Sequence, residues 1–139
     1  MEFFAGIILA IVVGVSTSSA GMDRDRSFYP VVTIIVASYY VLFALMGGSL
    51  EALFIESIVM AAFLVAAIAG FKNSPWIIVV ALATHGILDV FHSHMIANPG
   101  VPAWWPGFCM AYDVVAAGYL AFRLSAGMKK SRGGINLRI

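Results

Sequence analysis

Five apolar runs, each about as long as a bilayer is thick, limit the folds open to this chain more than any other feature. A hydrocarbon core of about 30 Å requires about 20 residues of helix. Hydrophobic residues make up 62% of the 139 residues and charged residues only 11%. The sequence therefore predicts an all-α integral membrane protein, a bundle of five transmembrane helices in a single domain over residues 1–128. The expected spans are residues 3–20, 28–47, 50–71, 76–97 and 106–127, followed by a basic cytoplasmic tail at 129–139.

Two of the breaks between the runs carry residues that typically begin a helix. Ser49 precedes the third run, and Ser74 followed by Pro75 precedes the fourth. A serine at the N-cap accepts a hydrogen bond from a free backbone N–H, and proline suits the first helical position. We therefore expect helices to begin directly after Ser49 and Ser74.

The basic residues are confined to one side of the predicted topology. The positive-inside rule places such residues in the cytoplasm, which gives an N-terminus outside and a cytoplasmic C-terminus. The expected location is the inner (plasma) membrane, crossed several times, with the lipid bilayer as the surrounding partner. The residues concerned are Arg24, Arg26, Lys72, Arg123, Lys129, Lys130, Arg132 and Arg138.

The first run also resembles a signal peptide, because Ser18, Ser19 and Ala20 are similar to a cleavage site. However, the residues before the run carry no positive charge, and the apolar stretch is long. We therefore expect residues 3–20 to remain as a membrane span.

Three ionisable residues form a stripe on the fourth run, because His85, Asp89 and His92 follow one another at i, i+4 and i+7. At 100° per residue they lie within roughly 60° of one another on a helix. His94 falls roughly opposite the stripe. Ionisable residues inside a membrane are expensive, so they face a bundle interior or a cavity, where they are paired or bind a ligand. The stripe is therefore the expected functional centre.

Two further acids are expected at the depth of the stripe. Glu56 and Asp113 each lie about six residues inside their spans from the outer surface, roughly 9–10 Å at 1.5 Å per residue. The second run brings Tyr39 and Tyr40 to a comparable depth. We therefore expect the carboxylates and the stripe to meet in one cavity in the outer leaflet, with His94 pointing away.

Two imidazoles and up to three carboxylates resemble the ligand set of a metal ion. Neutral histidine and ionised aspartate or glutamate suit Zn, Fe or Mn, and the scarcity of sulfur disfavours copper. A metal would also explain how carboxylates stay charged at low dielectric. The expected ligands of a divalent metal, zinc being preferred, are His85, Asp89, His92 and Asp113.

Other interpretations stay open. The same side chains can form a hydrogen-bonded network that fixes helix packing without a metal. Cys109 lies one turn before Asp113 and is a further candidate ligand, although we expect it to pack as a small apolar residue. His94 and Met95, facing outward, offer a weaker copper-binding alternative.

Four segments resemble a family of small bacterial multi-pass membrane proteins of unknown function. The resemblance covers most of the chain from about residue 23 to residue 123, and it implies no activity. A looser likeness is to the alkaline-ceramidase-like membrane hydrolases, which hold zinc with histidines beside Asp and Ser. Those proteins have seven helices and three histidine ligands, against five spans and two well-placed histidines here. The segments that carry the first resemblance are 26–30, 37–44, 85–92 and 109–113.

As an enzyme, such a site suits metal-dependent hydrolysis of a lipid or another apolar substrate, because the metal acidifies a bound water. Glu56 or Asp113 is the expected general base, and Tyr39 or Tyr40 would stabilise developing charge. The alternative is a transporter or proton relay that uses the same residues, followed by a structural or accessory membrane subunit. Nothing predicts nucleic-acid binding, and homo-oligomerisation stays open.

Overall fold

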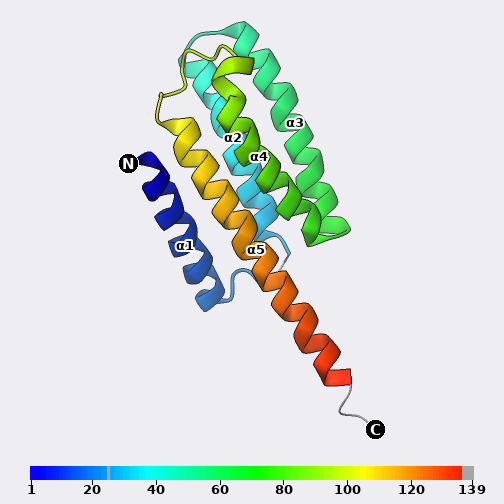
Figure 1. The fold of residues 1–139 in the computed structure, drawn as a ribbon. Helices are drawn as coiled ribbons and strands as arrows, with labels where there is room; N and C mark the ends of the chain where they lie inside the picture. The colour runs from blue at the N-terminus through cyan, green and yellow to red at the C-terminus, as the bar shows by residue number, and fades with distance from the viewer. Residues whose placement is uncertain (25, 136–139) are drawn as a thin grey trace.

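The computed structural model describes residues 1–24 and 26–135, which form five α-helices and no β-strand (Figure 1). All five helices are long and apolar enough to cross a membrane, as in a multi-pass membrane protein. The helices are α1 (Glu2–Ala20), α2 (Phe28–Met46), α3 (Leu50–Lys72), α4 (Pro75–Met95) and α5 (Trp105–Ile135).

The first four helices match the predicted spans to within two residues at each end. The fifth differs, because the predicted span ends at residue 127 whereas α5 continues to Ile135. The first part of the predicted tail at 129–139 is therefore helical, and residues 136–139 lie outside the described residues. Lysine and arginine favour helix, and this stretch contains no proline to end it.

Both expected helix starts are confirmed. The Ser49 hydroxyl accepts a hydrogen bond from the Ala52 N–H at 3.2 Å, and the Ser74 hydroxyl accepts one from the Trp76 N–H at 3.4 Å. Pro75 occupies the first position of α4. These caps satisfy backbone donors that have no partner within the helix.

Helix α4 lies at the centre of the bundle, where it packs against α5, α3 and α2. Helix α2 also packs on α3, while α1 packs along α5 at the edge of the bundle (Figure 1). The contact of α1 is close because a Cβ at Gly6 would overlap the Phe108 carbonyl oxygen of α5. Side chains on α4 therefore meet side chains from three helices.

The two ends of the bundle differ in their connections. The α2–α3 turn and the α4–α5 loop (residues 96–104) lie at one end, here named the loop end (Figure 1). The α1–α2 and α3–α4 connections and the C-terminal part of α5 lie at the other, here named the tail end. The N-terminus and the last described turn of α5 lie at opposite ends of the bundle.

The α4–α5 loop folds back onto the end of α2. A Cβ at Gly100 would overlap the carbonyl oxygen of Phe43, so the approach requires glycine. The Gly100 N–H donates a hydrogen bond to Asn98 Oδ1 at 3.3 Å. The loop thereby fixes the Asn98 side chain over the bundle interior.

The ionisable residues buried in the helices gather at one level of the bundle, whereas the buried polar residues towards the tail end are Thr17 and Thr33. Towards the tail end, α4 buries Ile78, Ala81 and Leu82, and α3 buries Phe63. In the described helices, the buried carboxylates and imidazoles lie at the level of His85 or nearer the loop end. Large apolar side chains are exposed on the outer faces of all five helices, which is typical of helices surrounded by lipid. The polar site is thus closed by apolar packing on its tail-end side.

Candidate metal centre

The stripe on α4 faces the interior of the bundle. His85, Asp89 and His92 are only 3%, 2% and 8% exposed, respectively. His94, two residues further along the same helix, is exposed. The spacing therefore places three ionisable side chains where water is excluded, and each then needs a partner within the protein.

A first group of four side chains gathers where α4 meets α5, and we name it the His85 group. His85 Nδ1 lies 2.7 Å from Asp113 Oδ2 and 3.5 Å from Asp89 Oδ2. The Cys109 thiol donates to Asp113 Oδ2 over 3.8 Å. All four residues are buried, and one potential ligand atom from each lies within 4.8 Å of the others. Such a group can hold a metal ion.

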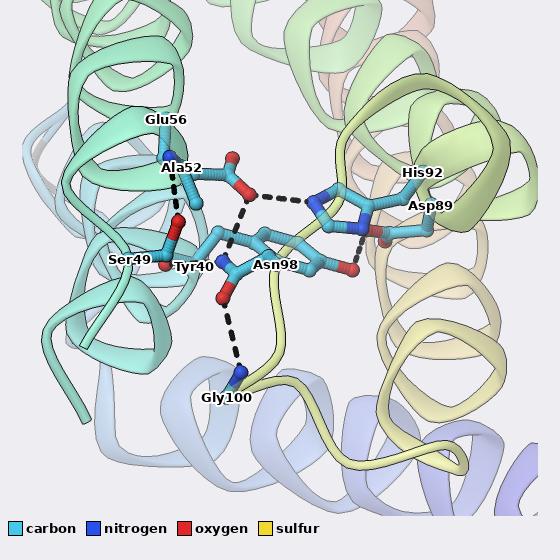
Figure 2. A network of polar contacts seen from close by, with 8 residues as sticks. All are labelled: Tyr40, Ser49, Ala52, Glu56, Asp89, His92, Asn98 and Gly100. Carbon is cyan, nitrogen blue, oxygen red and sulfur yellow. Dashed lines mark hydrogen bonds and ion pairs between the residues drawn. The ribbon is translucent and has the colours of Figure 1, made fainter. Parts of the chain in front are cut away.

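A second group joins α3, α4 and the α4–α5 loop. His92 Nε2 lies 2.7 Å from Glu56 Oε1. The Asn98 amide donates to the same oxygen at 3.0 Å and also lies 3.0 Å from the Tyr40 carbonyl oxygen. Figure 2 shows these side chains pointing toward one another from separate elements. Glu56 is therefore held from two sides through one of its oxygens.

Tyr40 of α2 connects the two groups. Its hydroxyl donates a hydrogen bond to Asp89 Oδ1 at 2.6 Å (Figure 2). Its ring stacks on the His92 ring, with centroids 4.0 Å apart and planes 22° from parallel. One side chain thus orients a carboxylate of the His85 group and an imidazole of the second group.

Two carboxylate oxygens of the His85 group have no hydrogen-bond partner. These are Asp89 Oδ2 and Asp113 Oδ1, and both are buried. A buried oxygen of an ionised carboxylate is costly when no donor or cation faces it. The structure therefore leaves acceptor capacity beside the His85 imidazole.

The site is reached from the loop end by a cleft of about 970 Å³. Asp89, His92 and Asn98 form its deep part, while Glu51 and Phe3 line it nearer the surface. A smaller cavity of about 60 Å³ adjoins it and shares Asp89, His92 and Ile96 with its lining. Its polar lining consists of Tyr40, Glu56, His85, Asp89 and His92.

The structure brings most of the predicted site residues together. His85, Asp89 and Asp113 share the His85 group, and His92 and Glu56 adjoin it through Tyr40. The close group differs from the predicted ligand set in one member, because Cys109 takes the place of His92.

Tyr39 does not join the site. Its ring lies 4.9 Å from Trp105 and 6.4 Å from Phe43, in an apolar groove between α1, α2 and α5. Tyr40, one residue later, points about 100° away and reaches Asp89. Of the two predicted tyrosines, only Tyr40 contacts an ionisable residue of the site.

Sequence reasoning missed Asn98, and it named Cys109 as a further candidate ligand but favoured a packing role for it. Cys109 and Asp113 are four residues apart on α5, so their shared face was a visible signal. Asn98 is followed by Pro99 and Gly100, a pattern that indicates a turn but not that the amide enters the bundle. Only the folded loop reveals that contact.

Comparison of the chain with protein-family models, curated proteins and solved structures finds no match in any of the three. The resemblances noted in the sequence therefore stay predictions, and the function is argued from the geometry of the site.

Proposed function

We propose that this protein binds a divalent transition-metal ion within the membrane and uses it for hydrolysis. His85, Asp89 and Asp113 would hold the ion, with Cys109 beside it and the fourth position left to water. Zinc is the preferred metal because imidazole, carboxylate and thiolate are its usual ligands. The observation that carries the proposal is that Asp89 Oδ2 and Asp113 Oδ1 are buried beside His85 without a hydrogen bond, the nearer contact of Asp89 Oδ2 being His85 Nδ1 at 3.5 Å.

Charge balance favours a metal over a network of protein groups alone. Three buried carboxylates face two buried imidazoles, so full protonation of both histidines would still leave one negative charge. None of the described ion pairs of these carboxylates involves lysine or arginine. An uncompensated charge in a medium of low dielectric is strongly unfavourable. Because a ligating histidine is neutral, a divalent cation would supply two of the three positive charges that these carboxylates need.

The cleft supports hydrolytic chemistry. It connects the loop end with Asp89 and His92, so water and a substrate can approach the ion. Apolar side chains, among them Val90, Val101 and Met110, line it together with the polar residues. Such a lining suits an amphiphile, for example a lipid with a hydrolysable ester or amide. A metal ion at this place would supply an acidified water.

The packing below the site argues against a transport pathway. Towards the tail end, Ile78, Leu82 and Phe63 are buried in apolar contacts. In the described parts of α2, α3 and α4, no buried carboxylate or imidazole lies on the tail-end side of His85. A proton or ion that reached His85 from the cleft would meet apolar side chains. The site is therefore better suited to a reaction than to passage.

Elemental analysis of the detergent-purified protein after metal-replete expression tests the proposal. We expect about one equivalent or more of a divalent transition metal in the parent protein, and less than about a tenth in His85→Ala and Asp89→Asn. His94→Ala is the matched control, because His94 is exposed on the same helix and should keep the full content. A parent protein with less than about a tenth of an equivalent would refute the metal site.

A panel of ester and amide amphiphiles then tests the reaction. The metal-loaded parent should release product from at least one of them, and His85→Ala from none. Full metal content without hydrolysis of any member would refute the hydrolase while leaving the metal site intact.

We also propose that the loop end faces outward and the tail end faces the cytoplasm of the inner membrane, with the bilayer as partner. The segregation of lysine and arginine supports this orientation. Reporter fusions after residues 72 and 132 should score cytoplasmic, and a fusion within residues 98–104 should score external. A cytoplasmic score for the 98–104 fusion would reverse the orientation.

A further inference from the structure

A second large hollow lies between α1 and α2. It is the apolar groove that contains Tyr39, and its volume is about 450 Å³, within the range of about 300–1,000 Å³ that ligand pockets have. Helix α1 packs along α5, whereas α2 packs on α3 and α4. Residues of α5 therefore form the floor of the groove, and α1 and α2 form its two walls. Its described lining shares no residue with the cleft that leads to Asp89.

The groove opens sideways, towards the surroundings of the bundle. Leu9 on the α1 wall and Ile35 on the α2 wall are 43% and 47% exposed. The helices are long and apolar enough to cross a membrane, so this opening would face hydrocarbon. Water does not fill an apolar hollow, and an empty hollow loses the dispersion contacts of its lining. A hydrocarbon chain is the occupant that suits these surroundings.

The dimensions of the groove match one acyl chain. It extends along α1 from Glu2 to Val13, about 16 Å at 1.5 Å per residue, which is close to half of a hydrocarbon core of about 30 Å. That depth is the one that a single acyl chain fills. Spread over this length, the volume gives a cross-section of about 28 Å², well below that of a helix about 10–12 Å wide. The groove is therefore too narrow for a helix of a second protein.

The loop end of the groove is lined by aromatic residues that favour the membrane surface. The Trp105 ring lies 4.9 Å from Tyr39 and 5.5 Å from Trp104. Tryptophan and tyrosine gather where the hydrocarbon meets the lipid headgroups. Trp104 is 52% exposed, and no described hydrogen bond uses its indole N–H. This donor is available to an ester carbonyl, which in a lipid lies between the headgroup and the acyl chain.

We propose that the groove binds one phospholipid of the membrane. One acyl chain lies between α1 and α2 on the floor formed by α5, and the ester carbonyl of that chain accepts a hydrogen bond from Trp104. The headgroup then lies at the loop end, beside the aromatic residues. The chain fills the space between α1 and α2 and so joins α1, at the edge of the bundle, to the other helices.

The lipid that stays with the full-length protein in mild detergent tests the proposal by native mass spectrometry. We expect about one phospholipid per chain in the parent protein and less than about a tenth in Ala5→Trp, because an indole at this position of the α1 wall occupies the groove. Ala62→Trp is the matched control, because Ala62 is an exposed alanine of α3 outside the groove, and it should keep the lipid. Trp104→Phe retains a ring but loses the N–H, so delipidated Trp104→Phe should bind phospholipid about 5–10-fold more weakly in titration.

Photolabelling in proteoliposomes locates the bound chain, with a phospholipid that carries a diazirine on one acyl chain as the probe. We expect the label to concentrate on the residues of α1, α2 and α5 that line the groove. Label spread evenly over the exposed faces of all five helices would overturn the proposal, and so would equal lipid retention in Ala5→Trp and the parent. Two copies of the chain crosslinked through the groove would also overturn it. The labelling of the parent protein decides the matter even if Ala5→Trp fails to fold, and neither measurement depends on a bound metal.

Discussion

The two ends of the bundle both contain buried acids, but they compensate the charge differently. At the tail end, Asp23 Oδ2 lies 3.3 Å from an Arg123 guanidinium nitrogen and accepts a hydrogen bond from Ser18 at 2.6 Å. Ser18 is also hydrogen-bonded to Tyr119 at 2.8 Å. At the loop end, the described partners of the carboxylates are imidazoles, a phenol, a thiol and an amide.

This difference indicates which network needs a ligand. A guanidinium is always charged, so the tail-end pair is balanced in charge, although Asp23 Oδ1 is buried without a hydrogen-bond partner. An imidazole is readily neutral, and the loop end has more carboxylates than imidazoles. We conclude that the tail-end network fixes α1 and its connection against α5, and we propose that a cation completes the loop-end network.

The largest expected effect comes from removing a carboxylate of the His85 group. Asp113→Ala should abolish metal binding and, because it breaks a buried pair, lower the free energy of unfolding by about 3–5 kcal/mol. Asp113→Asn should also lose the metal but cost less stability, since the amide can still hydrogen-bond with His85. Metal analysis together with thermal melting checks both variants. Full metal content in Asp113→Ala would contradict the account of the loop end.

A smaller effect is expected from the residue that connects the two groups. Tyr40→Phe removes the hydrogen bond to Asp89 but retains the ring on His92, so metal affinity should fall about 10–100-fold. Competition with a chromophoric chelator measures this affinity. Tyr39→Phe is the matched control and should leave the affinity unchanged, because Tyr39 lies in the apolar groove. Equal affinities of the parent and Tyr40→Phe would show that the phenol does not position Asp89.

The smallest effect is expected at the tail end. Arg123 is 45% exposed, so water screens its pair with Asp23, and Arg123→Met should cost about 1 kcal/mol or less. Its metal content should equal that of the parent protein. Melting in low and high salt measures the electrostatic contribution of this pair to stability. Salt should lower that contribution in the parent protein and have no such effect in the variant. Loss of metal in Arg123→Met would mean that the two ends are coupled.

Much of the fold could be predicted because membrane helices follow simple rules of length and capping. Ser49 and Ser74 correctly predicted where two helices begin. The length of the apolar runs predicted most of the other helix ends. The end of α5 could not be predicted from apolar length, because polar residues outside the membrane can continue a helix. Depth along the helices correctly predicted that Glu56 and Asp113 lie beside the stripe. Asp113 contacts His85, and Glu56 contacts His92.

The pairing within the site could not be predicted, because it depends on how each helix is rotated about its own axis. Helices that are apolar on all sides give little signal of which face is buried. Tyr39 and Tyr40 share a depth but lie about 100° apart, so only one reaches Asp89. For the same reason, the sequence did not indicate that His92 pairs with Glu56 rather than joining Asp113. The position of the Asn98 side chain depends on the course of the α4–α5 loop, which the spacing of residues in the sequence does not determine.

The melting temperature of the metal-replete parent protein, measured with and without a strong chelator, tests the central claim most directly. A ligand that binds only the folded state at about 1,000 times its Kd stabilises it by about 4 kcal/mol. We therefore predict that the chelator clearly lowers the melting temperature of the parent and of Arg123→Met, but not that of His85→Ala. A parent protein whose melting temperature ignores the chelator would contradict the claim that a metal ion completes the loop-end network.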